Sequence, residues 1–129
     1  MKLTKRLSIL YAEDNVDAGV MLMTLLGLSD IDVLLARSVE EALQAAQNGN
    51  FDLYLLDNRF PGESGLELCQ QLRTLSPQTP IVFYSGVAYP ADKQKGLEAG
   101  ADVYLVKPDV GSVASTIFQL VTSNPLNRI

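Results

Sequence analysis

Five short apolar segments alternate with five helix-like segments along this chain, and this alternation limits the fold more than any other feature. The apolar segments are about as long as strands and are rich in β-branched and aromatic residues; they span residues 7–12, 32–37, 51–56, 80–85 and 102–107. Their hydrophobicity is nearly continuous, as expected for a strand that is covered on both faces. The sequence therefore predicts strands buried in the centre of a sheet.

The intervening segments show the three- and four-residue spacing of apolar positions that is typical of amphipathic helices. They span residues 16–28, 39–48, 65–75, 91–99 and 110–122. In the first segment the expected buried face consists of Val16, Val20, Met23 and Leu26. Because strands that alternate with helices predict right-handed crossovers, we expect an α/β fold: a doubly wound, five-stranded parallel sheet flanked by five helices.

Composition sets the size and narrows the function. We expect one domain over residues 1–129, long enough for a hydrophobic core and without an apolar run that could enter a membrane. The single cysteine, Cys69, cannot form an internal disulfide, which suits a reducing cytoplasm. The net charge of −5 argues against direct nucleic-acid binding. The absence of histidine excludes histidine-based acid–base catalysis and the commonest zinc ligand.

Polar side chains stand at the ends of four of the five predicted strands. Glu13 and Asp14 follow the first strand, Asp57 follows the third, Ser85 closes the fourth and Lys107 the fifth. In an open parallel sheet, ligands bind beyond the carboxyl ends of the strands. If the first and third strands are neighbours, their ends lie about 5 Å apart. The three carboxylates would then share one pocket.

Three carboxylates in one pocket repel each other, by roughly 3 kcal/mol per pair at about 5 Å and an effective dielectric constant near 20. Either some of them keep a proton or a cation lies among them. A site made only of oxygen ligands favours Mg²⁺, with Mn²⁺ as the next choice, over Zn²⁺. The Lys107 ammonium suits an incoming anion, and a phosphoryl group between metal and lysine would make Asp57 a candidate nucleophile.

Each of these residues also has an ordinary structural interpretation. Asp14 can cap the helix that follows it, and Asp57 can start a turn through its side-chain oxygen. Ser85 with the glycine after it can be a plain loop, and Lys107 can simply end a strand. Their joint placement at one edge of the sheet favours the functional interpretation over four separate structural ones.

The motifs YAEDN, LLDNRFPGESGLEL, FYSG and GADVYLVKP lie at the ends of the first, third, fourth and fifth predicted strands. In these motifs and their separations, the chain resembles the receiver domain of two-component response regulators over about residues 6–123. The resemblance implies a flavodoxin-like strand order of 2-1-3-4-5 and often a cis Lys107–Pro108 bond. Residues 124–129 are expected to be a tail or the start of a linker. Whether the chain is a full-length regulator or a fragment of a larger protein stays open.

The resemblance also implies a role for each site residue. Asp57 would be the phosphoacceptor. The ligands of Mg²⁺ would be Glu13, Asp14, Asp57 and the backbone carbonyl of Arg59. The groups that bind or sense the phosphoryl group would be Ser85, Lys107 and Tyr104. The surface that changes with phosphorylation would be formed by residues 91–99, 102–107 and 110–122.

Arg59 and Val87 depart from the commonest form of the family. They lie two residues after Asp57 and Ser85 and would flank the path of a water molecule that attacks the phosphoryl group. Neither side chain offers a neutral amide or a carboxylate to orient that water. We therefore expect slow self-dephosphorylation.

The leading hypothesis is a phosphorylatable signalling module of a phosphorelay, and not an enzyme beyond its own phosphorylation and slow dephosphorylation. It would receive the phosphoryl group from a histidine kinase or a histidine phosphotransfer protein and act on an output protein or domain. The oligomeric state stays open, with a homodimer through the switching surface as one outcome. The alternatives are a receiver-like interaction module that works without phosphorylation and, less favoured, a Mg²⁺-dependent aspartyl-phosphate phosphohydrolase.

Overall fold

The computed structural model describes residues 6–87 and 89–123, and its centre is an open parallel sheet. The strands are β1 (Leu7–Ala12), β2 (Ile31–Ala36), β3 (Leu53–Leu56), β6 (Ile81–Ser85) and β7 (Val103–Val106). Their order in the sheet is β2-β1-β3-β6-β7, which is the order 2-1-3-4-5 when only these five strands are counted. The predicted strands and topology are confirmed. The predicted tail, residues 124–129, lies outside the described residues.

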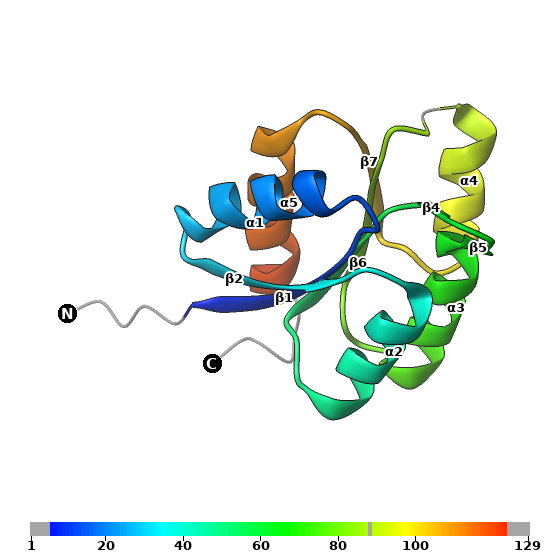
Figure 1. The fold of residues 1–129 in the computed structure, drawn as a ribbon, viewed down its shortest axis with the longest axis horizontal. Coiled ribbons are helices and arrows are strands. Elements are labelled where there is room, and N and C mark those ends of the chain that lie inside the picture. Colours follow the sequence, from blue (N-terminus) through cyan, green and yellow to red (C-terminus); the bar gives the residue numbers. More distant parts are fainter. Residues whose placement is uncertain (1–5, 88, 124–129) are drawn as a thin grey trace.

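Five helices cover the two faces of this sheet. They are α1 (Val16–Gly27), α2 (Val39–Asn48), α3 (Gly65–Leu75), α4 (Pro90–Glu98) and α5 (Val110–Ser123). Figure 1 shows α1 and α5 on one face and α2, α3 and α4 on the other. Successive side chains of each strand point to opposite faces of the sheet. Leu10 and Phe83 therefore belong to one buried cluster, and Ile9 and Val82 belong to the other. The doubly wound fold class is therefore confirmed.

Side-chain caps fix where three of these helices begin. The Asn15 side chain accepts a hydrogen bond from the N–H of Ala18 at the start of α1, and the Ser38 hydroxyl accepts one from Glu41 at the start of α2. Ser64 caps α3 in the same way. The interpretation of Asp14 as the helix cap is therefore wrong, because Asn15 fills that position and leaves the Asp14 carboxylate available.

The buried face of α1 differs from the predicted one. Gly19, Leu22 and Leu26 face the core, whereas Val16 and Val20 are each 43% exposed. The reason is close packing at Gly19, where a Cβ atom would lie 3.1 Å from a methyl group of Leu35. Leu26 of the predicted face is buried and Met23 is half-buried, so the prediction is wrong at Val16 and Val20, because apolar spacing does not count the glycine between them as a core residue.

A short hairpin follows β3 that the sequence analysis did not predict. It consists of β4 (Arg59–Phe60) and β5 (Glu63–Ser64), which pair antiparallel around Gly62 with its positive φ of 71°. The hairpin leads directly into α3, whose first residue, Gly65, donates its N–H to the Asn58 carbonyl oxygen at 3.0 Å. The end of β3 and the start of α3 are therefore in direct backbone contact.

Two further features of the described residues complete the fold. The Lys107–Pro108 peptide bond is cis, as the family resemblance implied. In the described part of the chain, no helix has the length and apolar content needed to cross a bilayer.

Candidate functional site

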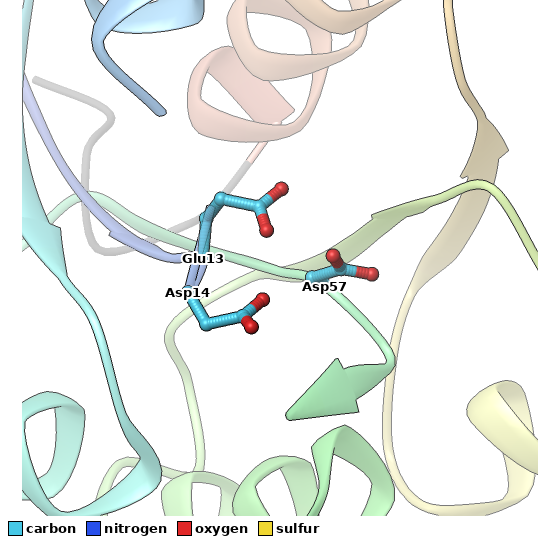
Figure 2. A group of neighbouring side chains, drawn as sticks. All are labelled: Glu13, Asp14 and Asp57. Carbon is cyan, nitrogen blue, oxygen red and sulfur yellow. The ribbon is translucent and has the colours of Figure 1, made fainter. Parts of the chain in front are cut away.

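The parallel register of β1 and β3 brings three acidic side chains together at the carboxyl edge of the sheet. Ala12 pairs with Leu56, and the Asp57 N–H donates to the Ala12 carbonyl oxygen at 3.0 Å. The residues that follow these two strand ends are therefore neighbours, as Figure 2 shows. One carboxylate oxygen from each of Glu13, Asp14 and Asp57 lies within 4.8 Å of the others. The prediction of a shared acidic pocket is confirmed.

Glu13 is held in one orientation by three donors. Its side chain is almost fully buried, and its Oε1 accepts a hydrogen bond from the Tyr11 hydroxyl at 3.1 Å and another from Lys107 Nζ. Its Oε2 accepts one from the Asn15 N–H at 3.2 Å. Burial raises the pKa of Glu13 because it penalises the charged form, and the hydrogen bond from Lys107 acts against this rise. The Glu13 carboxylate is thus fixed in one orientation, and keeping it charged costs free energy because it is buried.

Lys107, directly after β7, connects two of the acids. Its Nζ donates to Glu13 Oε1 and also to Asp57 Oδ2, at 3.3 Å from the latter. Burial by itself would lower the pKa of Lys107, but the hydrogen bond to Glu13 and the charge of Asp57 outweigh burial and raise it. The ammonium therefore stays protonated at neutral pH and compensates part of the negative charge of the cluster.

Ser85 ends β6 next to this cluster and is fully buried. Its backbone carbonyl accepts a hydrogen bond from the Lys107 N–H at 3.0 Å, and its hydroxyl oxygen accepts one from the Val87 N–H at 3.2 Å. The serine is therefore at the position in the sheet that the sequence predicted, and its hydroxyl oxygen holds the start of the loop before α4.

Tyr104, on β7, lies between the sheet and α4. Its ring centroid is 5.3 Å from that of Phe83, and a Cβ atom on Gly96 of α4 would come within 2.7 Å of the tyrosine ring. Its hydroxyl donates to the Val87 carbonyl oxygen at 2.7 Å. The predicted switch aromatic is thus half-buried and in contact with the loop that follows Ser85.

The remaining predicted residues lie at the rim. Asp14 and Arg59 are exposed, and Arg59 pairs with Ser64 in the short hairpin. Val87 is half-buried, and its backbone groups make the hydrogen bonds to Ser85 and Tyr104 described above. Arg59 and Val87 thus lie two residues after Asp57 and Ser85, at the solvent side of the site.

Two residues that contribute to the site were missed by the sequence analysis. Tyr11 sits inside a strand with 1% exposure and donates its hydroxyl to Glu13. Asn58 follows Asp57; its N–H donates to Asp57 Oδ1 at 2.7 Å and its side-chain amide donates to Tyr104. A signal for Tyr11 existed, because a buried tyrosine hydroxyl nearly always has a partner, and the nearest acid in the sequence is two residues away on the same face of the strand.

A surface hollow elsewhere on the molecule has no such chemistry. It has a volume of about 420 Å³ and lies between α2 and α3, lined by Leu43, Gln47, Gln70, Gln71, Thr74 and Leu75. None of these side chains is charged, and the hydroxyl of Thr74 donates to the Gln70 carbonyl oxygen of its own helix at 3.1 Å. The three carboxylates and the lysine of the candidate site lie instead at the acidic edge of the sheet.

The donor set of that edge fits a hard divalent cation. It offers three carboxylates, two buried and one exposed, so an ion can be reached from the solvent side through Asp14. Oxygen ligands at this spacing suit Mg²⁺, and the lysine compensates only one of the three charges. No buried side-chain nitrogen or oxygen in the described residues lacks a hydrogen-bond partner, so the two buried acids of the cluster, Glu13 and Asp57, are both satisfied.

An open α/β sheet that carries an acidic cluster, a hydroxyl and a lysine at its carboxyl edge defines the class of protein to which this chain belongs. The family described as the response regulator receiver domain matches residues 9–117. The chain therefore belongs to the response regulator receiver family.

Curated relatives support this assignment. The chain is 41% identical over 100 residues to the uncharacterized transcriptional regulatory protein YrkP of Bacillus subtilis, covering 78% of this chain and 42% of that protein. It is 33% identical over 108 residues to the transcriptional regulatory protein ResD of the same organism, covering 84% of this chain and 45% of that protein. The chain thus spans less than half the length of these relatives.

Solved structures agree with the fold. The chain is similar to the chemotaxis response regulator CheY4 of Vibrio cholerae, with 27% identity, a TM-score of 0.82, and coverage of 90% of this chain and 99% of that one. It is also similar to the receiver domain of the Francisella response regulator 1452, with 26% identity, a TM-score of 0.84, and coverage of 90% and 97%.

Proposed function

We propose that this domain accepts a phosphoryl group on Asp57 from a phosphohistidine donor, and that the modified state is read by a partner at α4, β7 and α5. The observation that carries the proposal is the position of Asp57. Its carboxylate lies within 4.8 Å of two other acids and within hydrogen-bonding distance of Lys107. A nucleophile, ligands for a cation and a compensating amine are thus adjacent.

The chain's own residues supply most of what the transfer needs. An Asp57 oxygen forms the new P–O bond while the N–P bond of the phosphohistidine breaks and the electron pair returns to the imidazole nitrogen. Lys107 stays protonated and pairs with the phosphoryl oxygens, and the Ser85 hydroxyl donates to one of them. Lys107 already donates to Asp57, so its pairing with the phosphoryl group requires little rearrangement.

Glu13, Asp14, Asp57 and the backbone carbonyl of Arg59 are proposed to hold Mg²⁺, for which Mn²⁺ can substitute. When bound, the ion would neutralise the negative charge that the carboxylates and the phosphoryl oxygens concentrate at one point. Glu13 is fixed by Tyr11, Asn15 and Lys107, so its contribution comes from a preset orientation.

The phospho-form is expected to be long-lived. The side chain of Arg59 is exposed and that of Val87 is half-buried and apolar, so neither orients a water molecule for attack on the phosphoryl group. A phospho-form half-life of seconds in Mg²⁺ would contradict this expectation.

The proposed partners follow from the chemistry. The donor is proposed to be a histidine kinase or a histidine phosphotransfer protein, and its phosphohistidine lies outside this chain, which contains no histidine. The receiver of the signal is an output protein or domain, and we place the reaction in the cytoplasm because a single cysteine suits a reducing compartment. The domain acts as a signalling switch and not as a turnover enzyme.

The proposal is tested by incubating the protein with Mg²⁺ and acetyl phosphate and measuring its intact mass. We expect a gain of one phosphoryl group that Asp57→Asn abolishes. Asp17→Asn, which changes an exposed carboxylate in the first turn of α1, serves as the matched control and should be phosphorylated normally.

The other outcomes are equally informative. No gain in mass with any donor would refute the proposal and favour an interaction module that works without phosphorylation. Steady release of phosphate from small phosphate esters would instead indicate a phosphohydrolase.

A further inference from the structure

A second chain of hydrogen bonds links Asp57 to Ser85 by way of the loop before α4. Asp57 Oδ1 accepts from the Asn58 N–H at 2.7 Å. The Asn58 side-chain amide then donates to the Tyr104 hydroxyl at 3.2 Å. That hydroxyl donates to the Val87 carbonyl oxygen at 2.7 Å, and the Val87 N–H donates to the Ser85 hydroxyl oxygen at 3.2 Å. The two ends of this chain are the two groups that face an incoming phosphoryl group.

The chemistry of the donors fixes the direction of the central bonds. The Val87 carbonyl can only accept, so the single hydroxyl proton of Tyr104 must point toward it. The partner on the other side of that hydroxyl must then be a donor, which is the NH₂ group of Asn58 and not its amide oxygen. A side chain of similar size without an N–H group cannot replace asparagine here.

The ring of Tyr104 has little freedom to move while this arrangement lasts. It packs on Phe83, and Gly96 of α4 lies so close to both rings that only a residue without a Cβ atom fits there. The hydroxyl is therefore presented to Asn58 and Val87 together. A movement of the Tyr104 hydroxyl that breaks its bond to Val87 therefore also changes its bond to Asn58.

We propose that Asn58 is a positioning residue that holds the loop of residues 85–87 in its present arrangement through the Tyr104 hydroxyl. In this arrangement the Ser85 hydroxyl oxygen is engaged by the Val87 N–H. Turning Ser85 toward a phosphoryl group on Asp57 breaks that bond and releases the loop. Asn58 thus sets how readily the loop of residues 85–87 rearranges when Asp57 is phosphorylated. This consequence rests on the function proposed above.

The test compares Asn58→Leu, Tyr104→Phe and the double variant in the full chain without any phosphodonor. The readout is amide hydrogen exchange at Val87, followed by NMR, with the amide of Leu10 in the sheet as a measure of overall folding. A hydrogen bond of ordinary strength predicts that Asn58→Leu lowers Val87 protection about 3- to 10-fold and leaves Leu10 protection unchanged. In the Tyr104→Phe background, the same substitution should have no further effect.

Two results would overturn the proposal. Either Val87 protection is unchanged in Asn58→Leu, or it falls by the same factor when the Tyr104 hydroxyl is already absent, which would show that Asn58 acts by another route. If Asn58→Leu lowers Leu10 protection as well, Asn58→Ala repeats the comparison with a smaller side chain.

A second measurement addresses the signalling consequence. Beryllofluoride, an analogue of the phosphoryl group, should bind Asn58→Leu severalfold more tightly than the parent protein in Mg²⁺, and equal affinity would refute this part. Because the exchange experiment uses no phosphodonor, its outcome is independent of whether Asp57 becomes phosphorylated.

Discussion

Replacing Gly65 with alanine would place a methyl group in space that the backbone of Asp57 already occupies. The added Cβ atom would lie 2.2 Å from the Asp57 carbonyl oxygen and 2.8 Å from the Asn58 Cα atom. Cβ atoms essentially never approach other atoms more closely than 3.0 Å, so the start of α3 and the end of β3 must separate by at least 0.8 Å. Neither contact is with a flexible side chain that could turn away.

Overpacking of this kind typically costs about 1–3 kcal/mol in free energy of unfolding. The better helix propensity of alanine offsets at most about 1 kcal/mol of this cost. The effect on chemistry should be larger, since a displacement of about 1 Å at a reacting group can reduce a rate about 100-fold. We therefore expect Gly65→Ala to be moderately destabilised and to accept a phosphoryl group from acetyl phosphate about 10- to 100-fold more slowly.

The matched control is Gly27→Ala at the end of α1, where an added Cβ atom would meet nothing within 4 Å. Urea unfolding gives the stability of both variants, and a time course of intact mass gives the phosphorylation rate. The reasoning would be refuted if Gly65→Ala matched Gly27→Ala in both measurements.

Three further predictions concern other parts of the structure. Asn15→Ala removes the side-chain cap of α1 but keeps the backbone N–H that donates to Glu13, and should lower the free energy of unfolding in urea by about 1 kcal/mol; an unchanged value would count against the cap. Arg73→Ala removes hydrogen bonds to the carbonyl oxygens of residues 77, 79 and 100 and an ion pair to Asp102. It should cost about 2 kcal/mol while the phosphorylation rate stays unchanged, and a slowed rate would show that this contact reaches the site. Burial raises the pKa of Cys69 to about 11, so the reactive thiolate is scarcer than in an ordinary cysteine; alkylation of the folded protein should stay slow through pH 9 and become fast in urea, and rapid native labelling at pH 8 would contradict the burial.

The sheet and its acidic edge could be predicted because both depend on short-range patterns. The continuous apolar runs of β3 and β6 mark strands that are covered on both faces, and the parallel topology then requires their carboxyl ends to lie together. The acids after β1 and β3 are neighbours because these two strands also lie side by side, an order that the family resemblance implied. Recognition of the family added the roles of Ser85, Lys107 and Tyr104, which strand patterns do not provide.

The features that were missed depend on close contacts between segments far apart in the sequence. Asn58 meets Tyr104 across 46 residues, and nothing near either residue in the sequence indicates the pair. Gly19 defines the buried face of α1 because the helix approaches Leu35 closely, which apolar spacing does not register. The hairpin of β4 and β5 was missed because strands of two residues have no periodicity to detect.

The sheet divides the interior into two buried clusters that share no side chains: one under α2, α3 and α4, and the other under α1 and α5. Substitutions such as Leu68→Ala in the first and Leu22→Ala in the second have no common partners, so their effects on stability should simply add. Each helix layer can therefore accumulate mutations without compensating changes in the other. The output surface proposed above takes α4 from one layer and α5 from the other, so adaptation to a new partner would draw on both buried clusters independently.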